Sequence, residues 1–177
     1  TGLFVDEAIR FIRASKGRPF YINLWTLVPH ALLKPTPEEL AVYENLQVDP
    51  KDFPSWMRGY VRDAKDPTEQ MKVFCAAMTG LDQAIGRLLD FLDAEGLADD
   101  TVIFCSSDNG PEDYHVGNAS NAGMGYPGPL RARKRSLYEG GIRTPLIVRW
   151  PGKVKAGRVD DTSVLAAVDF LPTVCKL

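Results

Sequence analysis

Hydrophobic residues recur along this chain with helical spacing in two segments. Apolar positions three and four residues apart predict an amphipathic helix over residues 3–14 and a longer one over residues 68–95. Thr68 is the predicted N-cap of the longer helix, and Gly96 its predicted stop. The apolar stripe of the shorter helix comprises Leu3, Phe4, Ala8, Ile9, Phe11 and Ile12, and that of the longer one Met71, Phe74, Met78, Leu81, Ile85, Leu88 and Leu92.

Shorter apolar runs, rich in β-branched and aromatic residues, predict strands at residues 20–26, 101–106 and 146–148. A last helix is predicted to begin near Asp169. Because strands alternate with helices, the sequence predicts an α/β fold with a mainly parallel sheet.

Two segments lack such periodicity and are predicted to be irregular. Residues 29–68 contain six prolines and many charges, so we expect a long excursion with one short helix at residues 38–44. Residues 109–129 are rich in Gly, Asn, Ser and Pro and are expected to form a loop. Loops of this length are unusual and are often functional.

Composition and charge narrow the class of protein. The 177 residues suffice for one globular domain, and a formal net charge of −2 gives no indication of nucleic-acid binding. No run of 18 apolar residues predicts a membrane span, and the first residues do not resemble a signal peptide. Cys75, Cys105 and Cys175 each lie in an apolar run and are predicted to be buried free thiols rather than zinc ligands.

The sharpest chemical signal is Ser107-Asp108-Asn109-Gly110, directly after the predicted strand 101–106. Ligands of open α/β sheets bind outside the carboxyl ends of the strands. An Asp carboxylate and an Asn carbonyl are hard oxygen ligands of the kind that calcium and magnesium prefer. Taken alone, however, Asp-Asn-Gly is equally a common turn sequence.

The wider sequence resembles the formylglycine-dependent sulfatases of the alkaline phosphatase superfamily, in particular the branch of N-acetylgalactosamine-6-sulfatase and bacterial polysaccharide sulfatases. The resemblance rests on blocks that occur in the family's order. They are Pro19-Phe20-Tyr21 with Pro29-His30, Leu81-Asp82 with Gly86, Thr101-Val102-Ile103-Phe104, Ser107-Asp108-Asn109-Gly110, residues 128–152 around Lys134 and Tyr138-Glu139-Gly140-Gly141, and Asp169-Phe170-Leu171-Pro172-Thr173.

This resemblance implies a role for each matching residue. Asp108 and Asn109 bind a divalent metal, usually Ca²⁺ or otherwise Mg²⁺, while Lys134 and His30 contact the sulfate group as catalytic and substrate-binding residues. His115 is a further candidate substrate contact. A sulfate ester gains negative charge on its leaving oxygen as the S–O bond breaks, and a cation, a lysine and an imidazolium offset that charge.

Simpler interpretations of the same residues remain open. His30 and His115 both lie in loops, where histidines are often only solvated. Lys134 belongs to a basic run with Arg131, Arg133 and Arg135, and such a run is typically a solvated surface. The glycines after Glu139 indicate a tight turn, with Arg143 near enough to pair with that carboxylate.

The resemblance also implies what the chain lacks. We expect residues 1–177 to be a single partial catalytic domain of an alkaline phosphatase-like three-layer sandwich, without the family's smaller C-terminal subdomain. The family's nucleophile, a formylglycine made within Cys/Ser-x-Pro-x-Arg, has no counterpart here, so the isolated chain is expected to be inactive. The parent protein is expected to be periplasmic, secreted or lysosomal and to hydrolyse sulfated carbohydrates or aryl sulfates.

Two other functions are compatible with the sequence. The first is a phosphodiesterase or phosphonate hydrolase of the same superfamily, although these relatives typically carry His where Asn109 stands, so this residue argues against them. A non-catalytic paralogue is the second alternative, in which Lys134 and its neighbouring arginines bind anionic glycans.

Overall fold

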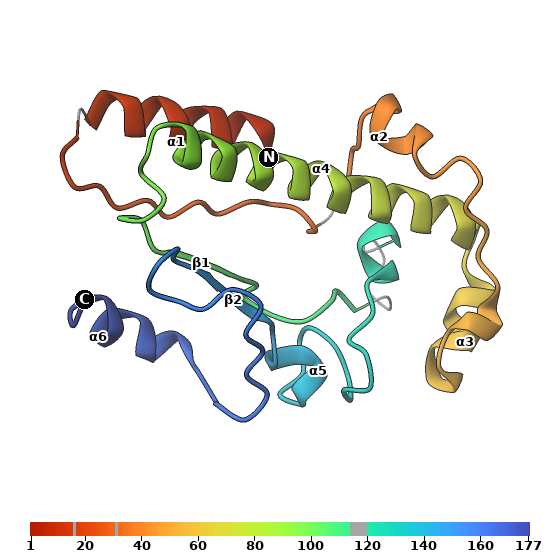
Figure 1. The fold of residues 1–177 in the computed structure, drawn as a ribbon. Coiled ribbons are helices and arrows are strands. Elements are labelled where there is room, and N and C mark those ends of the chain that lie inside the picture. The colour runs from red at the N-terminus through yellow and green to blue at the C-terminus, as the bar shows by residue number, and fades with distance from the viewer. Residues whose placement is uncertain (16, 31, 114–119) are drawn as a thin grey trace.

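The computed structural model describes residues 1–15, 17–30, 32–113 and 120–177 (Figure 1). Its elements in chain order are α1 (Gly2–Ser15), α2 (Pro37–Ala41), η1 (Pro50–Asp52), α3 (Ser55–Asp63), α4 (Pro67–Ala94), β1 (Ile103–Ser106), η2 (Ser120–Met124), α5 (Glu139–Ile142), β2 (Leu146–Arg149), η3 (Ala167–Asp169) and α6 (Phe170–Val174). Helix α4 organises the fold, because α1, α2 and η2 all pack against it. None of the described helices is both long and apolar enough to cross a membrane.

Helices α1 and α4 lie side by side and run in the same direction (Figure 1). Val5, Ala8 and Ile12, spaced by three and four residues, are the apolar residues that α1 buries. Both predicted helices are therefore confirmed. Part of the predicted stripe of α1 is wrong, since Leu3, Phe4 and Phe11 are exposed.

The two ends of α4 are fixed by local sequence. Its N-cap is Asp66, whose carboxylate accepts a hydrogen bond from the Glu69 N–H at 3.1 Å, so the prediction of Thr68 was wrong by two residues. Proline at the first helical position then suits the helix start. Gly96 adopts φ 69°, and the Leu97 N–H reaches back to the Leu92 carbonyl at 2.8 Å, which confirms the predicted stop.

The proline-rich segment 29–68 is more ordered than predicted. The expected short helix is present as α2, but α3 was missed. Pro54 is the N-cap residue of α3, a position at which a missing N–H breaks no helical hydrogen bond. Met57 and Val61, four residues apart, are fully buried, so α3 is held by the same helical spacing that marks α4.

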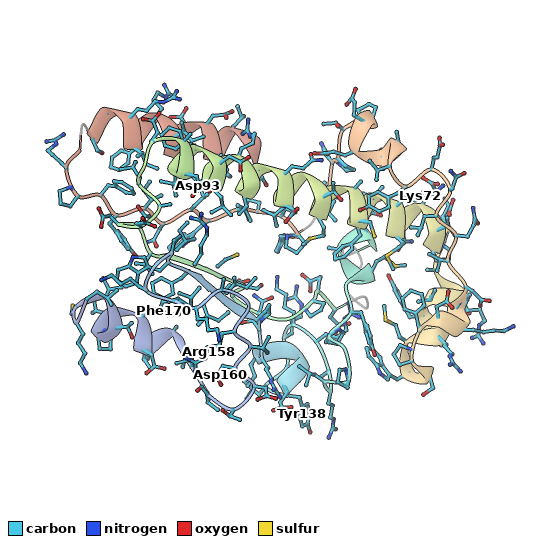
Figure 2. All side chains as sticks on the ribbon, viewed as in Figure 1. Lys72, Asp93, Tyr138, Arg158, Asp160 and Phe170 are labelled. Carbon is cyan, nitrogen blue, oxygen red and sulfur yellow. The ribbon has the colours of Figure 1, made fainter. Side chains whose placement is uncertain are left out.

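The sheet differs from the prediction. Within the described residues it has two strands, and β1 pairs with β2 in antiparallel register, with Ile103 opposite Arg149 and Ser106 opposite Leu146. The prediction of a mainly parallel sheet is therefore wrong for this pair of strands. Both predicted strands are present, and the Asp93–Arg149 ion pair of 2.6 Å links β2 to the end of α4, where Figure 2 labels Asp93.

The third predicted strand, residues 20–26, is extended but lies in no sheet of the described chain. It runs between the α1–α4 layer and the strands (Figure 1). Its side chains still alternate, with Tyr21, Trp25 and Leu27 exposed while Ile22 packs against the core cluster of α1 and α4. The period-two pattern is thus present without the hydrogen-bonded neighbour that a strand requires.

Two of the three cysteines contradict the prediction of burial. Cys105 and Cys175 are exposed, whereas Cys75 on α4 is half-buried, and this burial raises the pKa of its thiol. In β1, Phe104 packs edge-on against Phe170 of α6, with ring centroids 5.2 Å apart, and Figure 2 labels Phe170 beside the strands. Successive strand residues point to opposite faces, so Cys105 lies on the other face, which is not covered at that point.

Candidate active site

The Asp-Asn-Gly segment leaves the carboxyl end of β1, as predicted. Asp108 is exposed and Asn109 is half-buried. The turn is shaped locally, because the Ser107 hydroxyl donates to the Asn109 carbonyl at 2.8 Å. Upstream, the Ser106 hydroxyl donates to the Pro145 carbonyl at 2.8 Å and so ties the end of β1 to the start of β2.

Backbone hydrogen bonds join this segment to residues 131–141. The Gly110 N–H donates to the Gly141 carbonyl at 2.8 Å, and the Lys134 N–H donates to the Pro111 carbonyl at 2.9 Å. The approach is so close that a Cβ on Gly110 would lie 1.8 Å from the Gly140 carbonyl oxygen. These hydrogen bonds join two sequence blocks more than twenty residues apart and bring the backbone of Lys134 to Pro111, which follows the Asp-Asn-Gly turn. That the side chains of Lys134 and Asp108 share one pocket stays a prediction.

The side chain of Lys134 is engaged by Glu112, a residue that the sequence analysis did not single out. Lys134 Nζ lies 3.2 Å from Glu112 Oε2, and Arg135 Nε lies 3.3 Å from Oε1. The Asp113 N–H donates to the same carboxylate at 2.9 Å. Partial burial acts to raise the pKa of Glu112, but these hydrogen bonds and cations outweigh it and lower the pKa, so the carboxylate is ionised.

Arg133 is buried, contrary to the expectation that the whole basic run lies on a solvated surface. Its side chain is 5% exposed. Nη2 donates to the carbonyls of Gly123 and Gly125 at 2.7 and 2.6 Å, and Nε donates to the Glu112 carbonyl at 2.9 Å. Nη1 approaches Met57 Sδ of α3 at 3.8 Å. The Arg133 guanidinium thus connects the end of η2, helix α3 and the Glu112 backbone.

The other members of the basic run are on the surface, as the solvated interpretation proposed. Arg131 is exposed and stacks over the ring of Tyr138, 3.8 Å from its centroid, in the loop that leads into α5 (Figure 2). Arg135 is also exposed and adopts φ 77°. Glu139 and Arg143 form the anticipated exposed pair at 3.5 Å.

Of the two histidines, His30 is among the residues that the structure describes and His115 is not. His30 is exposed and lies in the turn that follows the extended residues 19–27, with its N–H bonded to the Leu27 carbonyl at 2.7 Å. Its convergence on Asp108 and Lys134 stays a prediction. His115 lies outside the described residues, so its expected substrate contact also stays a prediction.

The donor atoms of Asp108 and Asn109 fit a hard divalent cation in kind, since both offer oxygen. They fit it only in part, because calcium takes about six to eight oxygen ligands and magnesium about six. Among the described residues, no group of three or more His, Cys, Asp and Glu side chains is arranged to hold a metal ion. Any metal held here therefore needs ligands beyond this pair.

Comparison with known proteins defines the class. The family model described as Sulfatase matches residues 1–177, and the chain belongs to the sulfatase family. It is 31% identical to the steryl-sulfatase of Mus musculus over all of this chain and 24% of that protein. It is 30% identical to the N-acetylgalactosamine-6-sulfatase of Mus musculus over 90% of this chain and 25% of that protein.

The fold is also similar to that of solved sulfatases. A crystal structure of Ps i-CgsB in complex with k-i-k-neocarrahexaose superposes with a TM-score of 0.67 at 25% identity, over 88% of this chain and 29% of that chain. The chain thus spans about a quarter of the length of the relatives it matches. The resemblance noted in the sequence is confirmed at the level of the family.

Proposed function

We propose that the protein containing this chain hydrolyses sulfate esters of carbohydrates and that residues 1–177 supply one half of its active centre. The observation that carries the proposal is the pair of backbone hydrogen bonds between residues 110–111 and residues 134 and 141, which hold the Asp-Asn-Gly turn beside Lys134. Family membership supports the reaction class. The carbohydrate complex of a similar structure and the name of a relative that acts on N-acetylgalactosamine-6-sulfate support the substrate class.

In this proposal Asp108 and Asn109 hold part of a Ca²⁺ or Mg²⁺ ion, whose charge, when bound, offsets the negative charge of the sulfate oxygens. Lys134 donates hydrogen bonds to the ester oxygens, and His30 contributes a second polar group on the sulfate. These groups act on charge that grows as the S–O bond breaks, so they stabilise the transition state more than the bound ester. His115 is a further candidate for contact with the sugar.

The nucleophile must come from outside these residues. No Cys/Ser-x-Pro-x-Arg sequence occurs in residues 1–177, and electrostatic groups cannot replace a covalent nucleophile. We accordingly place the formylglycine elsewhere in the parent protein, and expect the chain alone to show no turnover. The parent is proposed to be periplasmic, secreted or lysosomal, on the strength of the family resemblance.

We also propose that the complete domain is the alkaline phosphatase-like three-layer sandwich of the family. The alternating exposure of residues 21–28 supports it, because an extended segment with this period suits a strand whose neighbours lie elsewhere in the protein. In such a sheet β2 remains an antiparallel member, as its register with β1 requires.

The substrate class can be tested by offering the complete protein three esters: an aryl sulfate, a sulfated oligosaccharide and an aryl phosphodiester with the same aryl leaving group as the sulfate. We expect release of phenol from an aryl sulfate and of sulfate from a sulfated oligosaccharide, and at least about 100-fold less from an aryl phosphodiester, because Asn109 replaces the histidine typical of phosphodiesterases. Faster cleavage of the phosphodiester would support the alternative hydrolase. Tight binding of the sulfated oligosaccharide with no release of sulfate would support the non-catalytic glycan binder.

A further inference from the structure

Glu112 occupies an unusual place for an acidic residue near an anion-binding site. Its side chain is 9% exposed, and both of its carboxylate oxygens are engaged, Oε2 by Lys134 and Oε1 by Arg135 and by the backbone of Asp113. A carboxylate held by so many donors has a defined orientation and does not drift with solvent. It is thus able to fix the groups that it contacts.

Lys134 is tied to residues 111–112 twice. Its backbone N–H bonds to the Pro111 carbonyl at 2.9 Å, and its ammonium group lies 3.2 Å from Glu112. A lysine side chain is long and flexible, so anchoring the backbone alone leaves the ammonium group free to sample many rotamers. Glu112 removes that freedom, and the Lys134 side chain is 21% exposed.

We propose that Glu112 is a positioning residue that holds the Lys134 ammonium group in place beside the Asp-Asn-Gly turn, where it meets the oxygens of the sulfate ester. This inference rests on the proposed function of Lys134. Glu112 reaches that position because it follows Asn109 by three residues, and the Arg133 guanidinium pins its carbonyl at 2.9 Å. Glu112 contacts two cations, Lys134 and Arg135, and its single negative charge neutralises only one of them. One net positive charge therefore remains in this group of three residues to attract the anionic ester.

The proposal can be tested in the complete protein with Glu112→Gln, which keeps the shape of the side chain but removes its charge. We expect kcat on an aryl sulfate to fall by about 10- to 100-fold, the range typical of a misplaced catalytic group, with a smaller change in KM. Glu112→Asp retains the charge on a shorter arm and should recover part of the loss. Glu139→Gln is the matched control, because it removes an exposed carboxylate from an ion pair in the same block.

A second readout does not depend on turnover. The rate at which an amine-reactive acetylating reagent labels Lys134, followed by mass spectrometry of the native protein, should rise several-fold in Glu112→Gln and stay unchanged in Glu139→Gln. Unchanged labelling and unchanged kcat in Glu112→Gln would overturn the proposal. The shorter arm of Glu112→Asp should leave both the labelling rate and kcat between those of wild type and Glu112→Gln. If Glu112→Gln fails to fold, wild-type labelling together with wild-type kcat in Glu112→Asp overturns the proposal. If wild-type protein cleaves no sulfate ester, the proposed function fails, while the labelling still decides whether Glu112 positions Lys134.

Discussion

Replacing Arg133 by methionine is expected to lower the free energy of unfolding by about 3 kcal/mol or more, since each buried carbonyl left without its donor costs about 1–3 kcal/mol. Arg133 donates to the carbonyls of Gly123 and Gly125, both in buried positions, and to that of Glu112. Methionine fills a similar volume but restores none of these hydrogen bonds. Urea unfolding of the purified protein measures the difference.

Two further variants make this prediction specific. Arg131→Met removes a neighbouring arginine that is exposed and stacks on Tyr138, so it should cost no more than about 1 kcal/mol. Arg133→Lys keeps the charge but cannot form the fork of hydrogen bonds, and should rescue little. Equal unfolding free energies for Arg133→Met and Arg131→Met would mean that Arg133 is not the fastening point of this loop.

Gly110→Ala is expected to destabilise the protein by about 2–4 kcal/mol, from overpacking of about 1–3 kcal/mol and loss of a hydrogen bond worth about 1 kcal/mol. The new Cβ would lie 1.8 Å from the Gly140 carbonyl oxygen and 3.2 Å from Gly141 Cα. These are backbone atoms, so no side-chain rotation relieves the clash, and the hydrogen bond from the Gly110 N–H to Gly141 must break. The Asp-Asn-Gly turn then separates from Lys134, and we expect activity of the complete protein to be lost with it.

Gly86→Ala is the matched control for that substitution. A Cβ on Gly86, in the middle of α4, meets no heavy atom within 4 Å. Alanine there should stabilise the helix by about 0.5–1 kcal/mol, because it restricts the unfolded chain and favours helix. Opposite signs for the two glycines in thermal unfolding are the expected result, and a neutral Gly110→Ala would contradict the close approach of the two blocks.

The parts of the fold that were predictable are those set by local sequence. The existence of α1 and α4 and the stop at Gly96 follow from apolar spacing and a glycine that adopts φ 69°. Helix α3 also had a local pattern in Met57 and Val61, but the surrounding prolines outweighed it. The antiparallel pairing of β1 with β2 was missed, because pairing depends on contacts between distant segments and leaves little trace in either strand.

In the candidate site, too, the features set by local sequence were predicted and those set by distant contacts were missed. The Asp-Asn-Gly turn was located correctly after β1, since strand and turn are both local. Nothing local distinguishes Arg133, which is buried, from Arg131 and Arg135, which are exposed. The difference arises from the tertiary structure, in which the backbone takes φ 64° at Ala132 and 77° at Arg135, and the Arg133 guanidinium meets the carbonyls of Gly123 and Gly125. Glu112 was missed because its partners are more than twenty positions away.

We propose that Asp108 and Lys134 act in one active centre. A double-mutant comparison of kcat/KM for aryl sulfate hydrolysis by the complete protein tests this most directly. We expect Asp108→Ala and Lys134→Ala each to lower kcat/KM by about 10²-fold or more, the range for loss of one group that stabilises transition-state charge. Residues that act as a unit are strongly non-additive, so the double variant should be little worse than the worse single variant. Single variants within about twofold of wild type, or a double variant whose loss is the product of the two single losses, would contradict the shared site.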